Sequence, residues 1–202
     1  MWGVNFNLEF YLSLCIGALS YILCYLCFYK KRNFGSYKNF AFCALHIYIF
    51  AVFSLTLNCY LHFITEMFGG GSFAFKQAFD AVSWSVYEEG ITLYKNCKLS
   101  GSMSEFYRII GGNLILLLPL GILIPLIDKK MNFIKMILIA IACPFIIEFL
   151  QFLGNCLVGS VLRDVSMSDF VLNAIGLLIG YGFYVLFFSG AKSGRKKSGK
   201  GK

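Results

Sequence analysis

Uninterrupted apolar runs, each close to the length of a membrane span, constrain this sequence more than any other feature. A helix needs about 20 apolar residues to cross about 30 Å of hydrocarbon at about 1.5 Å per residue. Five segments of the 202-residue chain meet or approach that length. They are about Leu8–Tyr29, Phe40–Ile64, Ile109–Ile127, Phe133–Leu153 and Asp169–Phe188. Continuous runs of this kind predict helices and argue against the alternating pattern of a β-barrel.

Composition supports the same class. The chain is 58% hydrophobic and only 14% charged, and its mean hydropathy is +0.72. This leaves too little polar surface to cover a water-soluble globule of this length. We therefore predict an all-α integral membrane protein with a bundle of about five transmembrane helices, forming one membrane domain over residues 1–190.

The distribution of basic residues predicts the orientation, because lysine and arginine accumulate in cytoplasmic loops near span ends. With the N-terminus outside and the C-terminus in the cytoplasm, 13 of the 18 basic residues lie inside. These are Lys30, Lys31, Arg32, Lys38, Lys129, Lys130, Lys135, Lys192, Arg195, Lys196, Lys197, Lys200 and Lys202. The tail 191–202 is the main source of the net charge of +8 and is predicted to be disordered and near anionic lipid. The charge therefore indicates no nucleic-acid partner.

The one long connection, Thr65–Arg108, is predicted to lie on the outer side. Within it, Ser72–Gly90 places Phe73 and Phe79 near helical spacing beside charged residues. This pattern predicts an amphipathic helix on the outer leaflet, with Trp84 at headgroup depth. A plain surface loop is the alternative.

Other residues on the outer side are interpreted locally. Ser104 is predicted to cap a short helix that leads into the third run. Cys59, Cys97 and Cys156 are expected at or beyond the outer face, where one disulfide among them is chemically possible but three thiols cannot all pair. No cysteine or histidine pattern indicates a metal site, and no cofactor is expected.

Glu148 is the polar residue that most needs an explanation, because it interrupts the apolar run IACPFIIEFLQFL. A charged group at the centre of a membrane span costs about 2.5–3.5 kcal/mol or more, so it is kept where something compensates it or where it has a function. The residues in the same region that can compensate it are Asn113, Gln151, Arg163, Asp169 and Asn173.

The predicted topology brings these residues to one depth near the outer surface. The third and fifth runs enter from outside and the fourth run leaves toward it, so Asn113, Glu148 and Asp169 reach the same level. Gln151 follows Glu148 by one helical turn and Asn173 follows Asp169 by one turn, so each pair shares a helix face. We predict a polar ligand-binding pocket that opens to the outer leaflet.

Arg163 lies in the loop between the last two runs and completes this predicted pocket. Its guanidinium can form a fork-shaped pair with Glu148 or Asp169. The alternatives are structural: an ion pair of Arg163 with Glu148 can tie the loop to the bundle, and Ser166 with Asp169 fits a capping box that starts the last helix. The three amide side chains can also serve only as interhelical hydrogen bonds.

The polar and small residues of the last three runs follow a recurring order. They are N-x5-P-x-G at Asn113, Pro119 and Gly121, E-x-x-Q at Glu148 and Gln151, Arg163 six residues before Asp169, and D-x3-N-x2-G-x3-G at Asp169, Asn173, Gly176 and Gly180. This order resembles the VanZ-like family of bacterial membrane proteins over about Ile109–Tyr184. Ser166 and Ser168 stand where that family usually has acidic residues, which argues against a role that needs several carboxylates in this loop. The two glycines of the last run are interpreted as a packing face.

Two functions from different classes follow. The resemblance implies a multi-pass protein of the bacterial cell membrane that contributes to resistance to teicoplanin, a glycopeptide antibiotic with an acyl tail. In the favoured reading the protein is not an enzyme, its partners are membrane lipids, and its pocket binds or excludes an amphiphile such as a lipoglycopeptide or a cell-wall lipid intermediate. In the alternative it is an intramembrane hydrolase or transferase on such a lipid, with Glu148 as the candidate catalytic acid or base.

Overall fold

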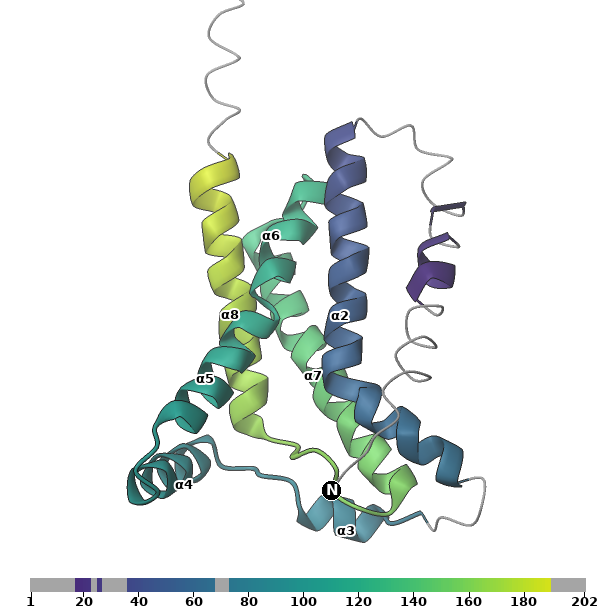
Figure 1. The fold of residues 1–202 in the computed structure, drawn as a ribbon. Helices are drawn as coiled ribbons and strands as arrows, with labels where there is room; N and C mark the ends of the chain where they lie inside the picture. Colours follow the sequence, from purple (N-terminus) through teal and green to yellow (C-terminus); the bar gives the residue numbers. More distant parts are fainter. Residues whose placement is uncertain (1–16, 23–24, 27–35, 68–72, 190–202) are drawn as a thin grey trace, which may run out of the picture. The chain divides into compact units, whose positions relative to one another are not determined.

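In the computed structural model the described residues are 17–22, 25–26, 36–67 and 73–189, and most of them are helical (Figure 1). The helices are α2 (Ser36–Met67), α3 (Phe75–Asp80), α4 (Val86–Leu99), α5 (Ser104–Leu116), α6 (Leu118–Ile127), α7 (Phe133–Val158), α8 (Met167–Tyr184) and the π-helix η2 (Val185–Ser189). The predicted all-α class is confirmed.

Four helical segments within the described residues are long and apolar enough to cross a membrane. They are Lys38–Leu57, Ser104–Ile127, Phe133–Val158 and Met167–Phe188, and they coincide with the last four predicted runs. The predicted first span, about Leu8–Tyr29, lies mostly outside the described residues, and the tail 191–202 lies wholly outside them. The count of five spans and their orientation stay predictions.

The chain divides into two compact units, which are described separately. The first unit comprises the described residues of Met1–Trp84 and Ile146–Ser166. The second comprises Ser85–Phe145 and the described residues of Met167–Lys202. The C-terminal half of α7 therefore belongs to the first unit and its N-terminal half to the second. One membrane domain over residues 1–190 stays a prediction.

In the second unit, the predicted third span consists of two helices that meet at Leu117. The backbone of Leu117 has φ −108° and ψ 1°, which is not helical, and α6 starts again with Pro119 in its first turn. Proline has no backbone N–H and its ring clashes with the carbonyl four residues earlier, so it is tolerated in a first turn and breaks a helix elsewhere. The N-x5-P sequence thus explains why α5 ends and α6 begins here.

Both of these helices pack against α8 with their backbones in close contact (Figure 1). A Cβ atom added to Gly176 would collide with Leu114 O, and one added to Gly180 would collide with Leu118 O. An added Cβ on Gly121 would lie 2.7 Å from Tyr181 N. The contacts advance along both segments together, so α5–α6 and α8 run in parallel. The interpretation of the α8 glycines as a packing face is confirmed.

In the first unit, α2 packs against the C-terminal half of α7 through Tyr60, which is buried. A Cβ on Gly154 would lie 2.6 Å from the Tyr60 ring, so the ring can approach α7 only at a glycine. The Thr56 hydroxyl donates to Val52 O at 2.8 Å, one turn back in α2. Such back-bonding bends helices, and α2 bends in its second half (Figure 1).

The long connection contains two separate helices rather than the single helix predicted over Ser72–Gly90. Short α3 ends at Asp80, and the chain is then extended, with Ser83 N donating to Val165 O at 2.9 Å in an isolated bridge between Ser83 and Ser166. Ser85 accepts from Glu88 N at 3.3 Å and starts α4. The prediction of one helix is wrong because the bridge and this new cap replace helical bonds between α3 and α4.

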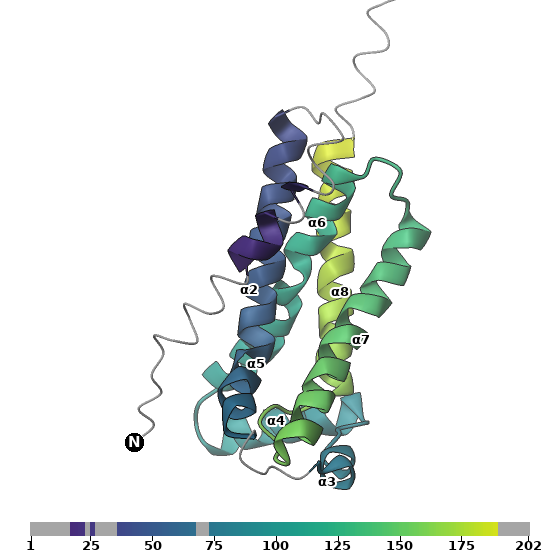
Figure 2. The ribbon, with the colours of Figure 1, turned by 90° about the vertical axis from the view of Figure 1, so that its right-hand side faces the viewer.

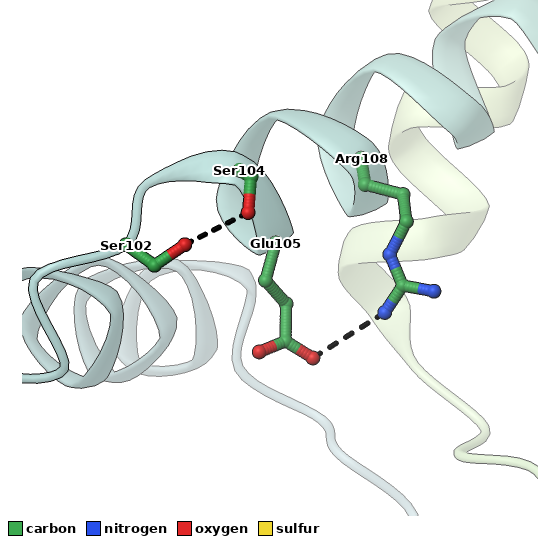
Figure 3. A network of polar contacts seen from close by, with 4 residues as sticks. All are labelled: Ser102, Ser104, Glu105 and Arg108. Carbon is green, nitrogen blue, oxygen red and sulfur yellow. Dashed lines mark hydrogen bonds and ion pairs between the residues drawn. The ribbon is translucent and has the colours of Figure 1, made fainter.

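Ser104 does not act as the predicted cap. It is the first residue of α5, which begins without a side-chain cap, and its hydroxyl lies 2.8 Å from that of Ser102 (Figure 3). Glu105 accepts from Arg108 at 3.4 Å on the exposed face of the same helix. The short helix that leads into the third span is itself confirmed.

The cysteines that the structure describes in the segments predicted to lie outside are free. Cys97 in α4 and Cys156 in α7 are both buried thiols. The side chain of Cys59 lies outside the described residues. Burial as a small apolar group accounts for Cys97 and Cys156 without a disulfide between them.

Candidate functional site

The six predicted site residues form two groups, one in each unit. Glu148, Gln151 and Arg163 belong to the first unit, and Asn113, Asp169 and Asn173 belong to the second. Within each unit the structure shows how the members are held. The single pocket predicted from all six residues stays a prediction.

Glu148 is buried in the C-terminal half of α7, and Gln151 is buried one turn further on. Oε2 of Glu148 accepts a hydrogen bond of 3.1 Å from the backbone N–H of Ser166, the residue that precedes α8. Hydrogen bonds to a carboxylate are roughly twice as strong as neutral ones. This bond therefore offsets part of the cost of holding an acidic group inside a membrane-length helix.

The Ser166 N–H is also the donor that a capping box would have given to Asp169. Ser166 occupies the position directly before the first residue of α8, as the capping reading requires. Its amide is engaged by Glu148, so the carboxylate that satisfies it comes from α7. Glu148 consequently fixes the main chain at the end of the loop that carries Arg163.

Asn155 is the residue of this group that sequence reasoning missed. Only 2% of it is exposed, and its Oδ1 accepts from Tyr60 OH at 3.0 Å and from Leu162 N at 2.9 Å. Its Nδ2 donates to Arg163 O at 2.8 Å, and Arg163 N lies 3.4 Å from its Oδ1. One side chain thus ties α2, α7 and the following loop together. Asn155 follows Glu148 by seven residues and so lies on the same helix face, and this spacing is the sequence signal that could have identified it.

Hydrogen bonds hold both the backbone and the side chain of Arg163. Asn155 holds the backbone, and Nη2 of the guanidinium donates to Leu55 O at 3.1 Å. The structure therefore shows a carbonyl of α2 as a partner of Arg163, where the sequence favoured Glu148 or Asp169. The side chain is exposed and directs a cation to the surface of the unit.

In the second unit, Nδ2 of Asn113 on α5 donates a hydrogen bond to Oδ1 of Asp169 in the first turn of α8. Asn173 follows Asp169 by one turn and is 1% exposed. Asn113 and Asp169 thus meet across two helices, and Asn173 lies on the same helix as Asp169. Amide-to-carboxylate pairing of this kind also stabilises helix packing in membranes.

Asn173 differs from its neighbours because its Oδ1 has no hydrogen-bond partner among the described residues. Leaving a buried amide oxygen unpaired costs about 1–3 kcal/mol. Packing alone does not favour such a residue, since an apolar side chain would avoid this cost. A buried acceptor beside a carboxylate can instead receive a hydrogen bond from a hydroxyl, amide or ammonium group of a ligand.

The model of the VanZ/LLP1 family matches residues 18–188, which is most of the chain. No curated protein and no solved structure matches it. The match includes all six candidate residues and the helices that carry them.

Proposed function

The chain belongs to the VanZ/LLP1 family, and from this premise we propose that it is a multi-pass protein of the bacterial cell membrane that contributes to glycopeptide resistance. Its polar groups bind an amphiphile, either a teicoplanin-type lipoglycopeptide or a cell-wall lipid intermediate, or exclude it from its target. The protein performs no chemical step in this proposal.

Asn173 carries the proposal. Its Oδ1 is a buried acceptor without a partner among the described residues, and Asp169 one turn away adds a carboxylate. Glycopeptides and lipid-linked sugars carry many hydroxyl, amide and amine donors that such acceptors can bind. A ligand that donates to Asn173 Oδ1 removes the cost of leaving that atom unpaired, so the cost becomes part of the binding free energy.

In the first unit, Arg163 and Glu148 also favour an amphiphilic ligand. The exposed guanidinium of Arg163 suits a carboxylate or phosphate, because its planar donors match both groups. The span-length helices around these residues give an acyl chain an apolar environment, where each buried methylene contributes about 0.8 kcal/mol. An acyl-tailed glycopeptide should therefore be a better ligand than an untailed one.

The second candidate function is hydrolysis or group transfer on a cell-envelope lipid. The buried carboxylate of Glu148, held by the Ser166 amide, favours it because a positioned acid or base is its first requirement. The sequence offers no serine or cysteine with a partnered histidine on the predicted outer side to act as nucleophile. We therefore place this function second.

One experiment separates these functions and tests the first. Cells with and without the protein are compared for sensitivity to teicoplanin and to an untailed glycopeptide, and their lipids are extracted and profiled. Binding predicts protection that is greater against teicoplanin with an unchanged lipid profile, whereas catalysis predicts altered lipids. Equal protection against both drugs contradicts the acyl-tail argument.

Variants that are present in the membrane at the same level as the wild type test whether the protection depends on the proposed residues. Asn173→Val should lose the protection, while Asn96→Val, on the exposed surface of α4, should keep it. A fully protective Asn173→Val variant removes Asn173 from the site.

A further inference from the structure

The segment around α3 carries four large aromatic side chains that are exposed. They are Phe73, Phe75, Phe79 and Trp84, with exposed fractions between 46% and 63%. Phe79 stacks on Phe75 at 5.9 Å between ring centroids and lies 5.7 Å from Trp84. We call these four residues the aromatic ridge. Aromatic side chains that are exposed side by side in this way indicate a contact with a partner or with a membrane.

Helix α3, which carries part of the ridge, lies beside the C-terminal end of the membrane-length helix α7 (Figure 2). Ala74 N donates to Cys156 O at 3.0 Å, and the ring of Phe75 meets that of Phe152 edge-on at 5.6 Å. Ala78 of α3 is buried, and Ser83 N is bound to Val165 O. The segment is thus attached at both ends to residues of the first unit, so its depth follows that of α7.

The length of α7 sets that depth. Its 26 residues extend about 39 Å at 1.5 Å per residue, while the hydrocarbon layer is about 30 Å thick. The last turns of α7 therefore reach the headgroup region. Cys156 and Phe152 are two and six residues before the end of the helix at Val158, so we expect the ridge at the boundary between headgroups and acyl chains. Aromatic side chains are enriched at this boundary.

The polar residues of the same segment fit a lipid headgroup. An open groove of about 930 Å³ lies along α3. Its lining residues are Phe73, Ala74, Phe75, Lys76, Gln77, Asp80, Ala81 and Val161. Lys76 can meet a lipid phosphate, and Phe73 and Val161 offer apolar contact to the first part of an acyl chain.

We propose that the aromatic ridge of α3 is a membrane-docking surface that seats in the phospholipid interface beside the C-terminal end of α7. The occupant is the surrounding bilayer, and none of the four aromatic residues is among the polar groups assigned to ligand binding. It holds the connection between α2 and α4 against the leaflet, so the part of this connection around α3 does not project into water.

Tryptophan fluorescence tests this directly, because the chain has only Trp2 and Trp84. The full chain carrying Trp2→Phe is reconstituted into phosphatidylcholine vesicles that contain lipids brominated near the headgroup or near the chain end. Trp84 should emit at shorter wavelength than a hydrated indole, lose more intensity to the shallow bromine than to the deep one, and resist aqueous iodide.

A second probe checks that the result does not depend on position 84 alone. Phe79→Trp combined with Trp84→Phe and Trp2→Phe places the reporter in α3 itself and should give the same order of quenching. Water-like emission with strong iodide quenching and no effect of brominated lipid, at either position, overturns the proposal.

Discussion

Two buried asparagines in this chain should respond in opposite directions to the same substitution. Asn173 and Asn155 are 1% and 2% exposed, and both lie on membrane-length helices. Oδ1 of Asn173 has no partner among the described residues, so Asn173→Val removes an unpaired acceptor. We expect the free energy of unfolding to stay equal or to rise by about 1–3 kcal/mol.

The matched substitution Asn155→Val should be strongly destabilising. It removes the acceptor of Tyr60 OH and Leu162 N and the donor to Arg163 O. Each buried group left unpaired costs about 1–3 kcal/mol, so three of them should lower the free energy of unfolding by at least about 3 kcal/mol. Because residue type, burial and replacement are alike in the two variants, the difference between them isolates the hydrogen bonds.

Both variants are purified in the same mild detergent, and unfolding is followed by thermal shift and by loss of the monodisperse species in size-exclusion chromatography. We expect Asn173→Val to melt at or above the wild-type temperature and Asn155→Val well below it. A loss of stability in Asn173→Val as large as that in Asn155→Val would show that Asn173 Oδ1 has a structural partner, and the argument for a ligand there would fail.

Three further outcomes are expected. Gly176→Ala should lower the yield of folded protein, because its Cβ would collide with Leu114 O. Gly182→Ala on the same helix has open space around its Cβ and should keep the yield. Equal yields of the two variants on size-exclusion chromatography would contradict the close packing of Gly176. Glu148→Gln should keep the membrane level on immunoblots, because its amide oxygen can still accept from Ser166 N–H, and should lose glycopeptide protection; an active variant excludes Glu148 from the site. Engineered cysteines near Lys98 should be labelled from outside and those in the tail 191–202 should not, and labelling of the tail from outside would overturn the predicted topology.

The sequence predicted the helices and their packing well where local chemistry decides them. Apolar length placed four spans within the described residues, and the small-x3-small spacing of Gly176 and Gly180 placed the α8 packing face. The parallel arrangement of α5–α6 and α8 is consistent with one intervening span. In each case the signal is periodic or local, so no knowledge of distant contacts was needed.

Contacts between residues far apart in the chain explain the features that the sequence did not predict. The chain is extended after α3 because Ser83 pairs with Ser166, 83 positions away. No sequence pattern near Ser83 predicts this pairing. Asn155 binds Tyr60, 95 positions away, and the loop that follows α7, so its role depends on a fold that must already be known. The hydrogen bond of Arg163 to Leu55 O was not predicted for a similar reason, because a backbone carbonyl of α2 has no signature in the residue types.

Direct binding measurements test whether the polar groups of this membrane protein bind a ligand. Purified protein is titrated with teicoplanin, with an untailed glycopeptide and with a cell-wall lipid intermediate while its thermal unfolding is measured. A ligand at 100 times its dissociation constant adds about 2.7 kcal/mol to the free energy of unfolding. We expect teicoplanin or the lipid intermediate to raise the melting temperature of the wild type but not of Asn173→Val, and the untailed drug to have little effect. No shift with any of the three, or the same shift in both proteins, would contradict this expectation.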